Sequence, residues 1–98
     1  MAVKFEQIEN DTQTGYAQWE IRVEHEGVYE IVGTIEKNTC WCGDGYRADS
    51  YSVTVGHEGQ DEAEACFQVQ NAWRSKGMTA QVALAACKRV AKAHLNEE

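Results

Sequence analysis

The chain has 98 residues, of which 43% are hydrophobic, and a formal net charge of −7. This composition predicts a single globular domain over residues 1–98, and the acidic balance argues against non-specific binding to nucleic acid or anionic membranes. No apolar run approaches the roughly 20 residues that a membrane-spanning helix needs. Acids also interrupt the first ten residues, where a secretion signal needs an apolar stretch, so we expect a cytoplasmic protein with reduced cysteines.

The first half of the chain alternates between apolar and polar residues, as half-buried strands do. Residues 3–9 predict a first strand, and the polar segment 10–15 predicts a turn after it. Residues 16–26 alternate most clearly and predict a second strand. The residues of this strand that we expect to face the core are Trp19, Ile21, Val23 and His25.

A third strand is predicted over residues 28–37, and Glu26-Gly27 before it predicts a hairpin turn. Its expected inward residues are Tyr29, Ile31 and Ile35. Gly33 inside this strand predicts either a β-bulge or a close approach of another backbone. Residues 49–55 predict a further strand, with Tyr51, Val53 and Val55 facing inward.

The period of the pattern changes to that of a helix over residues 79–95. Thr79 stands at the position of an N-cap, shortly after Gly77. The expected core-facing stripe of this helix consists of Ala80, Leu84, Cys87, Ala91 and Leu95. Because most of these side chains are small, the helix can lie close against a sheet.

Residues 61–76 fit two structures. Asp61 and Glu64 have the spacing of a capping box, whereas Phe67 and Val69 alternate as in a strand. Glutamate, alanine and glutamine dominate the segment, which favours a helix. The resulting fold class is α+β, with an antiparallel sheet of three to four strands packed on one face by one or two C-terminal helices.

The outward positions of the predicted strands at 16–26 and 28–37 hold an excess of acids, and Arg22 is the lone base among them. The glutamates in question are Glu20, Glu24, Glu26, Glu30 and Glu36. Like charges on facing strands weaken a sheet. The row is therefore either a plain solvated face or a surface kept acidic for a partner.

The segment NTCWCGDGY, residues 38–46, brings two cysteines close to two glycines. Zinc sites commonly use cysteines separated by two to four residues, so Cys40 and Cys42 match that spacing poorly. We expect a tight loop between strands without a bound metal, and a zinc-stabilised domain remains an alternative. Trp41 either folds onto the core or is exposed as a binding anchor.

No arrangement of residues points to catalysis. His25, His57 and His94 are scattered over a strand end, a turn and the end of the helix, so no cysteine has an evident base. The sequence contains neither a glycine-rich phosphate loop nor a His-Glu-x-x-His motif. We expect no enzyme activity and no cofactor.

Two resemblances bear on function. Residues 77–95 resemble the closing helix of double-stranded-RNA-binding domains, but Thr79 and Gln81 stand where that family carries lysines, so we expect no direct contact with nucleic acid. In size, charge and predicted architecture the chain resembles small acidic phage-encoded inhibitors, such as the anti-CRISPR proteins. That resemblance implies an inhibitor acting in the cytoplasm of a host cell, whose acidic surface occupies a nucleic-acid-binding channel.

The sequence therefore predicts a non-enzymatic interaction protein whose acidic sheet face docks on a basic surface of a partner protein. The candidate partner-binding residues are Glu20, Glu24, Glu26, Glu30, Glu36 and Trp41. A small assembly module that forms a homodimer through Trp41 or Trp73 is the main alternative.

Overall fold

The computed structural model describes residues 2–42, 46–56, 62–70 and 77–95. These residues form a five-stranded sheet and a C-terminal helix, so the α+β class is confirmed and the sheet is larger than the three to four strands expected. The elements are β1 (Ala2–Asn10), β2 (Ala17–His25), β3 (Val28–Cys42), β4 (Tyr46–Val55), β5 (Ala63–Gln68) and α1 (Ala80–Leu95). No helix in the described ranges is long and apolar enough to cross a membrane.

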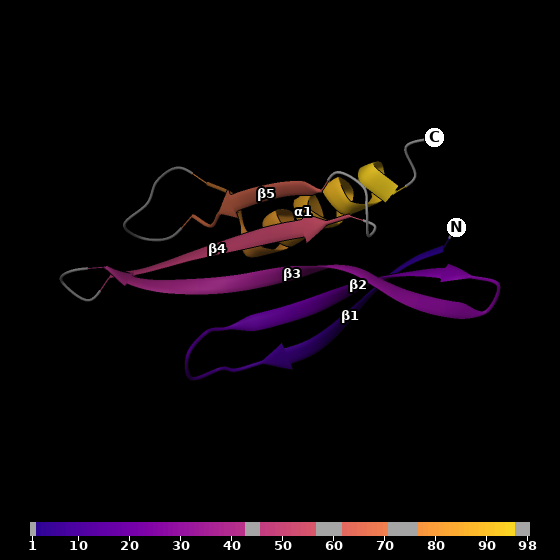
Figure 1. Cartoon of the computed structure of the whole chain (residues 1–98). Coiled ribbons are helices and arrows are strands. Elements are labelled where there is room, and N and C mark those ends of the chain that lie inside the picture. The colour runs from indigo at the N-terminus through magenta and orange to yellow at the C-terminus, as the bar shows by residue number, and fades with distance from the viewer. Residues whose placement is uncertain (1, 43–45, 57–61, 71–76, 96–98) are drawn as a thin grey trace.

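The strands lie side by side in the order of the sequence, and every neighbouring pair is antiparallel. The helix covers one face of this twisted sheet and packs mainly against β4 and β5 (Figure 1). One face of the sheet is thus covered by α1 over part of its width. We call the side of the sheet away from α1 the open face.

The predicted hairpin over residues 18–36 is confirmed as β2 and β3. His25 pairs with Val28, which leaves Glu26 and Gly27 as a two-residue loop. Both loop residues have positive φ values, 52° and 82°. This is the backbone of a type I′ turn, whose twist matches that of the flanking strands.

β5 replaces the helix that composition favoured for this part of the chain, so that prediction was wrong. Ala63–Gln68 pairs with β4, and its residues alternate between half-buried and exposed. The neighbouring edge of β4, with its buried Val53 and Val55, supplies both hydrogen bonds and an apolar surface. Pairing and burial therefore outweigh the weak helix preference of glutamate and alanine.

β3 contains a bulge that reverses which of its residues face the core. Ile21 of β2 pairs with Gly33, whereas the next residue, Arg22, pairs with Ile31, so Val32 is an extra residue. Val32 is consequently buried, at 6% exposure, while Tyr29 and Ile31 are 43% and 54% exposed. The inward orientation predicted for Tyr29 and Ile31 is wrong, because alternation holds only up to a bulge.

Gly33 fulfils both structural roles that the sequence suggested for it. It adjoins the bulge, and β4 passes very close to its α-carbon. A Cβ atom at this position would lie 2.2 Å from the backbone oxygen of Thr54 and 2.8 Å from the Cα of Val55. Only a residue without a side chain allows β3 and β4 to approach this closely.

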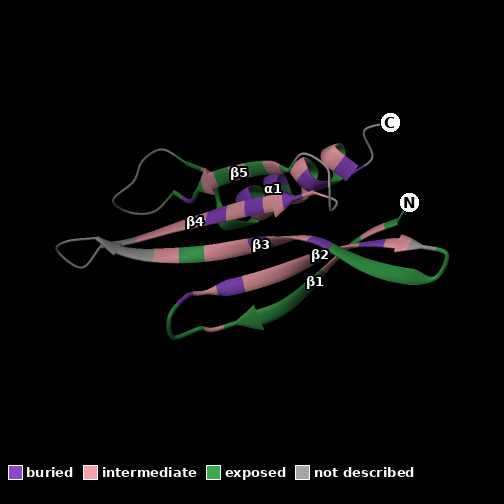
Figure 2. Cartoon of the chain, in the orientation of Figure 1, coloured by how far each residue is buried: buried purple, intermediate pink, exposed green. Residues whose placement is uncertain are grey.

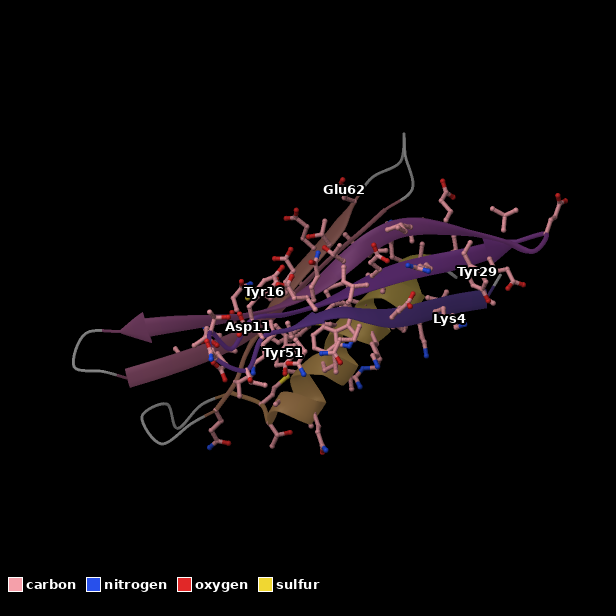
Figure 3. The ribbon with its side chains drawn as sticks, turned by 90° about the horizontal axis from the view of Figure 1, so that it is seen from below. Lys4, Asp11, Tyr16, Tyr29, Tyr51 and Glu62 are labelled. Atoms are coloured by element: carbon pink, nitrogen blue, oxygen red, sulfur yellow. The ribbon has the colours of Figure 1, made fainter. Side chains whose placement is uncertain are left out.

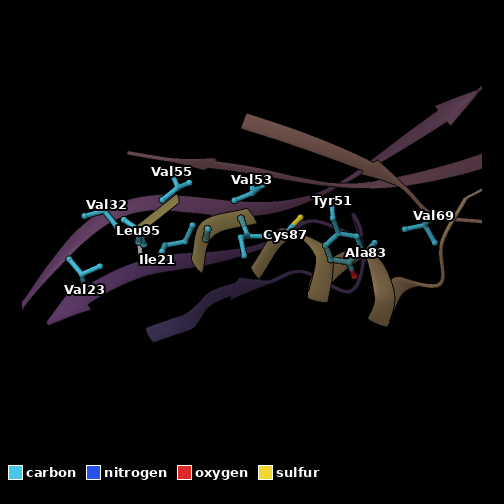
Figure 4. Packing of buried hydrophobic residues seen from close by; sticks show 12 residues of the cluster. Ile21, Val23, Val32, Tyr51, Val53, Val55, Val69, Ala83, Cys87 and Leu95 are labelled. Atoms are coloured by element: carbon cyan, nitrogen blue, oxygen red, sulfur yellow. The ribbon is translucent and has the colours of Figure 1, made fainter. Parts of the chain in front are cut away.

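The core lies between the sheet and α1 (Figure 4). Its fully buried members include Ile21, Val23, Ile35, Val53, Val55 and Cys87. On the helix, Cys87, Ala91 and Leu95 are buried as predicted, but Ala80 is exposed and Ala83 and Ala86 are buried instead. Small residues at the contact let the helix backbone lie near the sheet.

The predicted N-cap of the helix is confirmed. The side-chain oxygen of Thr79 accepts a hydrogen bond from the backbone N–H of Val82 at 3.2 Å, and its carbonyl accepts one from Ala83 at 2.9 Å. The side-chain bond satisfies the N–H of Val82, which has no backbone partner in the first turn, and the carbonyl accepts the first regular bond of the helix.

Candidate functional site: the open face of the sheet

Strand register brings carboxylates from four strands together on the open face. Glu20 of β2 lies directly across from Glu6 of β1, and on its other side from Thr34 of β3. Thr34 in turn faces Thr54 of β4, which faces Glu64 of β5. Residues that pair across antiparallel strands point to the same side of the sheet. This first row therefore runs across the whole sheet with an acid at each end.

A second row lies two residues further along the strands. Gln18 is flanked by Glu9 on β1 and Glu36 on β3. Tyr16 lies beside this row on the side of the sheet away from the helix, whereas Tyr51 lies on the helix side (Figure 3). Partial burial, followed by the charges of Glu36 and Glu9, raises the pKa of Tyr16 above its usual value.

Arg22 neutralises part of the first row. Its guanidinium forms ion pairs with Glu6 at 2.9 Å and with Glu20 at 2.5 Å. Lys4 lies directly across from Arg22 on β1. Among the paired residues of the described strands, these two bases share the open face with six carboxylates, which are Glu6, Glu9, Glu20, Glu24, Glu36 and Glu64.

An apolar area adjoins the acidic rows on the open face, close to the turn that joins β2 to β3. Tyr29 and Ile31 point to this side because they pair with Glu24 and Arg22. The Lys4 ammonium lies over the Tyr29 ring, 5.3 Å from its centroid. A hydrogen bond to Glu24 raises the pKa of the Tyr29 hydroxyl. We call Tyr29 and Ile31 the apolar pair.

The structure places the five predicted glutamates in three different settings. Glu20, Glu24 and Glu36 lie on the open face, as predicted. Glu26 lies in the β2–β3 turn, and Glu30 pairs with buried Val23, which places it on the helix side of the sheet. The assignment of Glu30 to the acidic face is therefore wrong, because the bulge at Val32 shifts the alternation by one residue.

Sequence reasoning missed Glu6, Glu9 and Glu64. The alternation of the first strand, with Val3 and Phe5 half-buried, already placed Glu6 outward, although which strand it would face was unknown. Glu64 was missed because its segment was predicted to form a helix. The side chains of Trp41, Cys40 and Cys42, and all of Trp73, lie outside the described residues.

The two described cysteines lie in different settings. Within the described ranges, no three metal-binding side chains come together. Cys66 is exposed on the open face, beside a shallow depression between β4 and β5. Cys87 is buried in the core, and this burial, with a smaller effect from Cys66, raises the pKa of its thiol to about 11. Such a thiol is a poor nucleophile at neutral pH because it stays protonated.

Comparisons with models of protein families, with curated proteins and with solved structures found no match to this chain.

Proposed function

We propose that the protein is a non-enzymatic interaction protein whose open face binds a basic, nucleic-acid-binding surface of a partner protein. The observation that supports this proposal is the excess of carboxylates on one continuous sheet face. Among the described residues, Glu9, Glu36 and Glu64 form no ion pair with a base. Like charges on neighbouring strands weaken a sheet, so these acids add no ion-pair stability to the described fold.

The geometry suits a surface that normally binds phosphates. Glu20 and Glu36 are diagonal neighbours on adjacent strands, which corresponds to a separation of about 7–8 Å. Neighbouring phosphates on a nucleic-acid strand repeat at a similar distance. Grooves that bind nucleic acid carry dense lysine and arginine, so the acidic rows would occupy such a groove and exclude its ligand by competition.

The apolar pair adds a second kind of contact. Tyrosine is among the residues that most often dominate binding energy at protein interfaces, and Tyr29 lies on the same face as Glu20 and Glu24. Charge would steer the partner toward the open face, and the apolar pair would hold it after contact. The resemblance to anti-CRISPR-like phage inhibitors is consistent with this mode of action.

The test compares two variants with the same change in charge. Glu36→Gln/Glu64→Gln removes acids from the open face, and Glu26→Gln/Glu30→Gln removes acids from the turn and from the helix side. Each variant and the wild type are immobilised to capture partners from a host lysate. The captured partner is then titrated in the presence of a labelled oligonucleotide.

We expect the open-face variant to bind about tenfold more weakly, since two charge contacts of roughly 0.7 kcal/mol each would be lost. The control variant should bind like the wild type. The wild type should displace the oligonucleotide, and added salt should weaken the complex. Equal binding by both variants, or binding that ignores salt, would show that the acidic rows are a solvated face only.

A further inference from the structure

We propose that two copies of the chain form a two-fold homodimer by pairing their β1 strands, antiparallel and centred on Phe5. β1 is the last strand on its side of the sheet, and no other described segment pairs with its outer edge. Most of the strand is exposed (Figure 2). An unpaired edge offers a row of backbone donors and acceptors to another strand.

The length of regular strand limits where the two-fold axis can lie. β1 pairs with β2 without interruption from Ala2 to Gln7, and the register then shifts, which leaves Ile8 as a bulged residue. A bulge ends a regular ladder. Within residues 2–7, an axis at Lys4 or at Phe5 pairs five residues of each copy, so strand length leaves these two positions equal.

Charge selects the axis at Phe5. With the axis at Phe5, Lys4 faces Glu6 of the partner subunit, and Glu6 faces Lys4 of the partner subunit. Both side chains stand on the open face, across from Arg22 and Glu20 respectively, so the two pairs can form on one side of the joined sheet. Opposite charges directly across strands stabilise pairing, and like charges oppose it.

The neighbouring registers bring like charges together. Moving the axis to Lys4 would set two lysines face to face, and moving it to Glu6 would do the same with two glutamates. The existing contacts leave both groups able to pair across the axis. Glu6 uses its Oε2 atom for Arg22, and Lys4 lies over the exposed ring of Tyr29.

The helix side of the same edge limits the strength of this dimer. The ammonium groups of Lys88 and Lys92 lie 5.5 and 5.9 Å from the centroid of the Phe5 ring. A two-fold axis at Phe5 brings both copies of these lysines near one another. We therefore expect a weak, reversible dimer, and the closed two-fold arrangement uses up the β1 edges instead of extending into a fibre.

The test uses the purified protein in sedimentation experiments from micromolar to millimolar concentration. The wild type should approach twice its mass of 11.0 kDa at the upper end. Lys4→Glu and Glu6→Lys each place two like-charge pairs at the axis, and we expect each to raise the dissociation constant about tenfold or more. Circular dichroism confirms that both variants remain folded.

Two recovery experiments make the result specific to this register. The double variant Lys4→Glu/Glu6→Lys restores both pairs with their charges exchanged, so it should dimerise like the wild type. An equimolar mixture of the two single variants should associate more tightly than either alone. The proposal is overturned if the wild type stays monomeric at millimolar concentration, if the single variants dimerise normally, or if neither recovery occurs.

Discussion

Gly33 allows β3 and β4 to approach each other closely, because it has no side chain. An added Cβ would meet a backbone carbonyl of β4 at 2.2 Å, and backbone atoms in mid-sheet cannot move aside as a flexible side chain can. By contrast, Gly27 has nothing within 4 Å of its virtual Cβ and is constrained only by its φ of 82°.

We expect Gly33→Ala to lower the free energy of unfolding by about 3 kcal/mol, because it overpacks the sheet. Gly27→Ala should cost only about 1 kcal/mol, for the left-handed backbone. Urea titrations of both variants measure the difference. Similar losses in the two variants would contradict the close approach of β4 to Gly33.

Cys87 makes stability depend on alkaline pH. Its thiol has a pKa of about 11 when buried, against an ordinary value of 9.0. Above pH 9.0 the unfolded chain loses this proton while the folded chain keeps it, so deprotonation favours unfolding. Stability due to this group is therefore complete below pH 9.0 and is lost as the pH rises toward about 11.

The free energy of unfolding, measured across that window, should fall more steeply in the wild type than in Cys87→Ala. Burial also raises the pKa of Tyr51, which leaves some alkaline loss in the variant. The variant loses part of its stability at every pH through the missing sulfur. Parallel curves for the two proteins would show that the thiol does not contribute.

At the scale of single elements, the helix depends on its first turn. Thr79 supplies the capping oxygen for the N–H of Val82, and no acidic residue stands in the first turn of α1. We expect Thr79→Ala to destabilise the protein by about 1 kcal/mol, measured by thermal or urea unfolding. Thr79→Ser keeps the hydroxyl and should lose much less; equal losses would rule out the cap as the cause.

Periodicity predicted the elements whose pattern is uniform, namely the second strand, the strand ending at Val55 and the final helix, and it gave a weaker signal for the first strand. It failed at β5, because glutamate and alanine favour a helix locally and only the edge of β4 could decide otherwise. Periodicity identified Gly33 as the place of a bulge or a close approach. It did not show that the extra residue Val32 changes which residues of β3 face the core. For the same reason Glu36 was assigned correctly and Glu30 was not, since they lie on opposite sides of Val32.

For the whole molecule, charge is distributed unevenly along the chain. Residues 1–66 contain 14 acids and 4 bases, whereas residues 67–98 contain 2 acids and 5 bases. In the fold, this difference places an acidic sheet face on one side and the cations of the helix, such as Lys88 and Lys92, on the other. Repulsion within the acidic part is a cost that screening by salt can relieve.

We therefore expect the Tm to rise with sodium chloride, since the screening length falls from about 10 Å at 0.1 M to about 3 Å at 1 M. Glu36→Gln/Glu64→Gln should start from a higher Tm at low salt and gain less from added salt. Differential scanning calorimetry measures both effects. The same salt response in wild type and variant would assign the rise to general salt effects on hydration.

The extra residue in β3 also makes the core, and not the open face, sensitive to chain length at this point. Without Val32, Ile31 would directly precede Gly33 and would still lie opposite Arg22, so Tyr29 and Ile31 would stay on the open face. The core would lose one buried valine. A single-codon deletion could thus thin the core while leaving the outer surface of the hairpin unchanged.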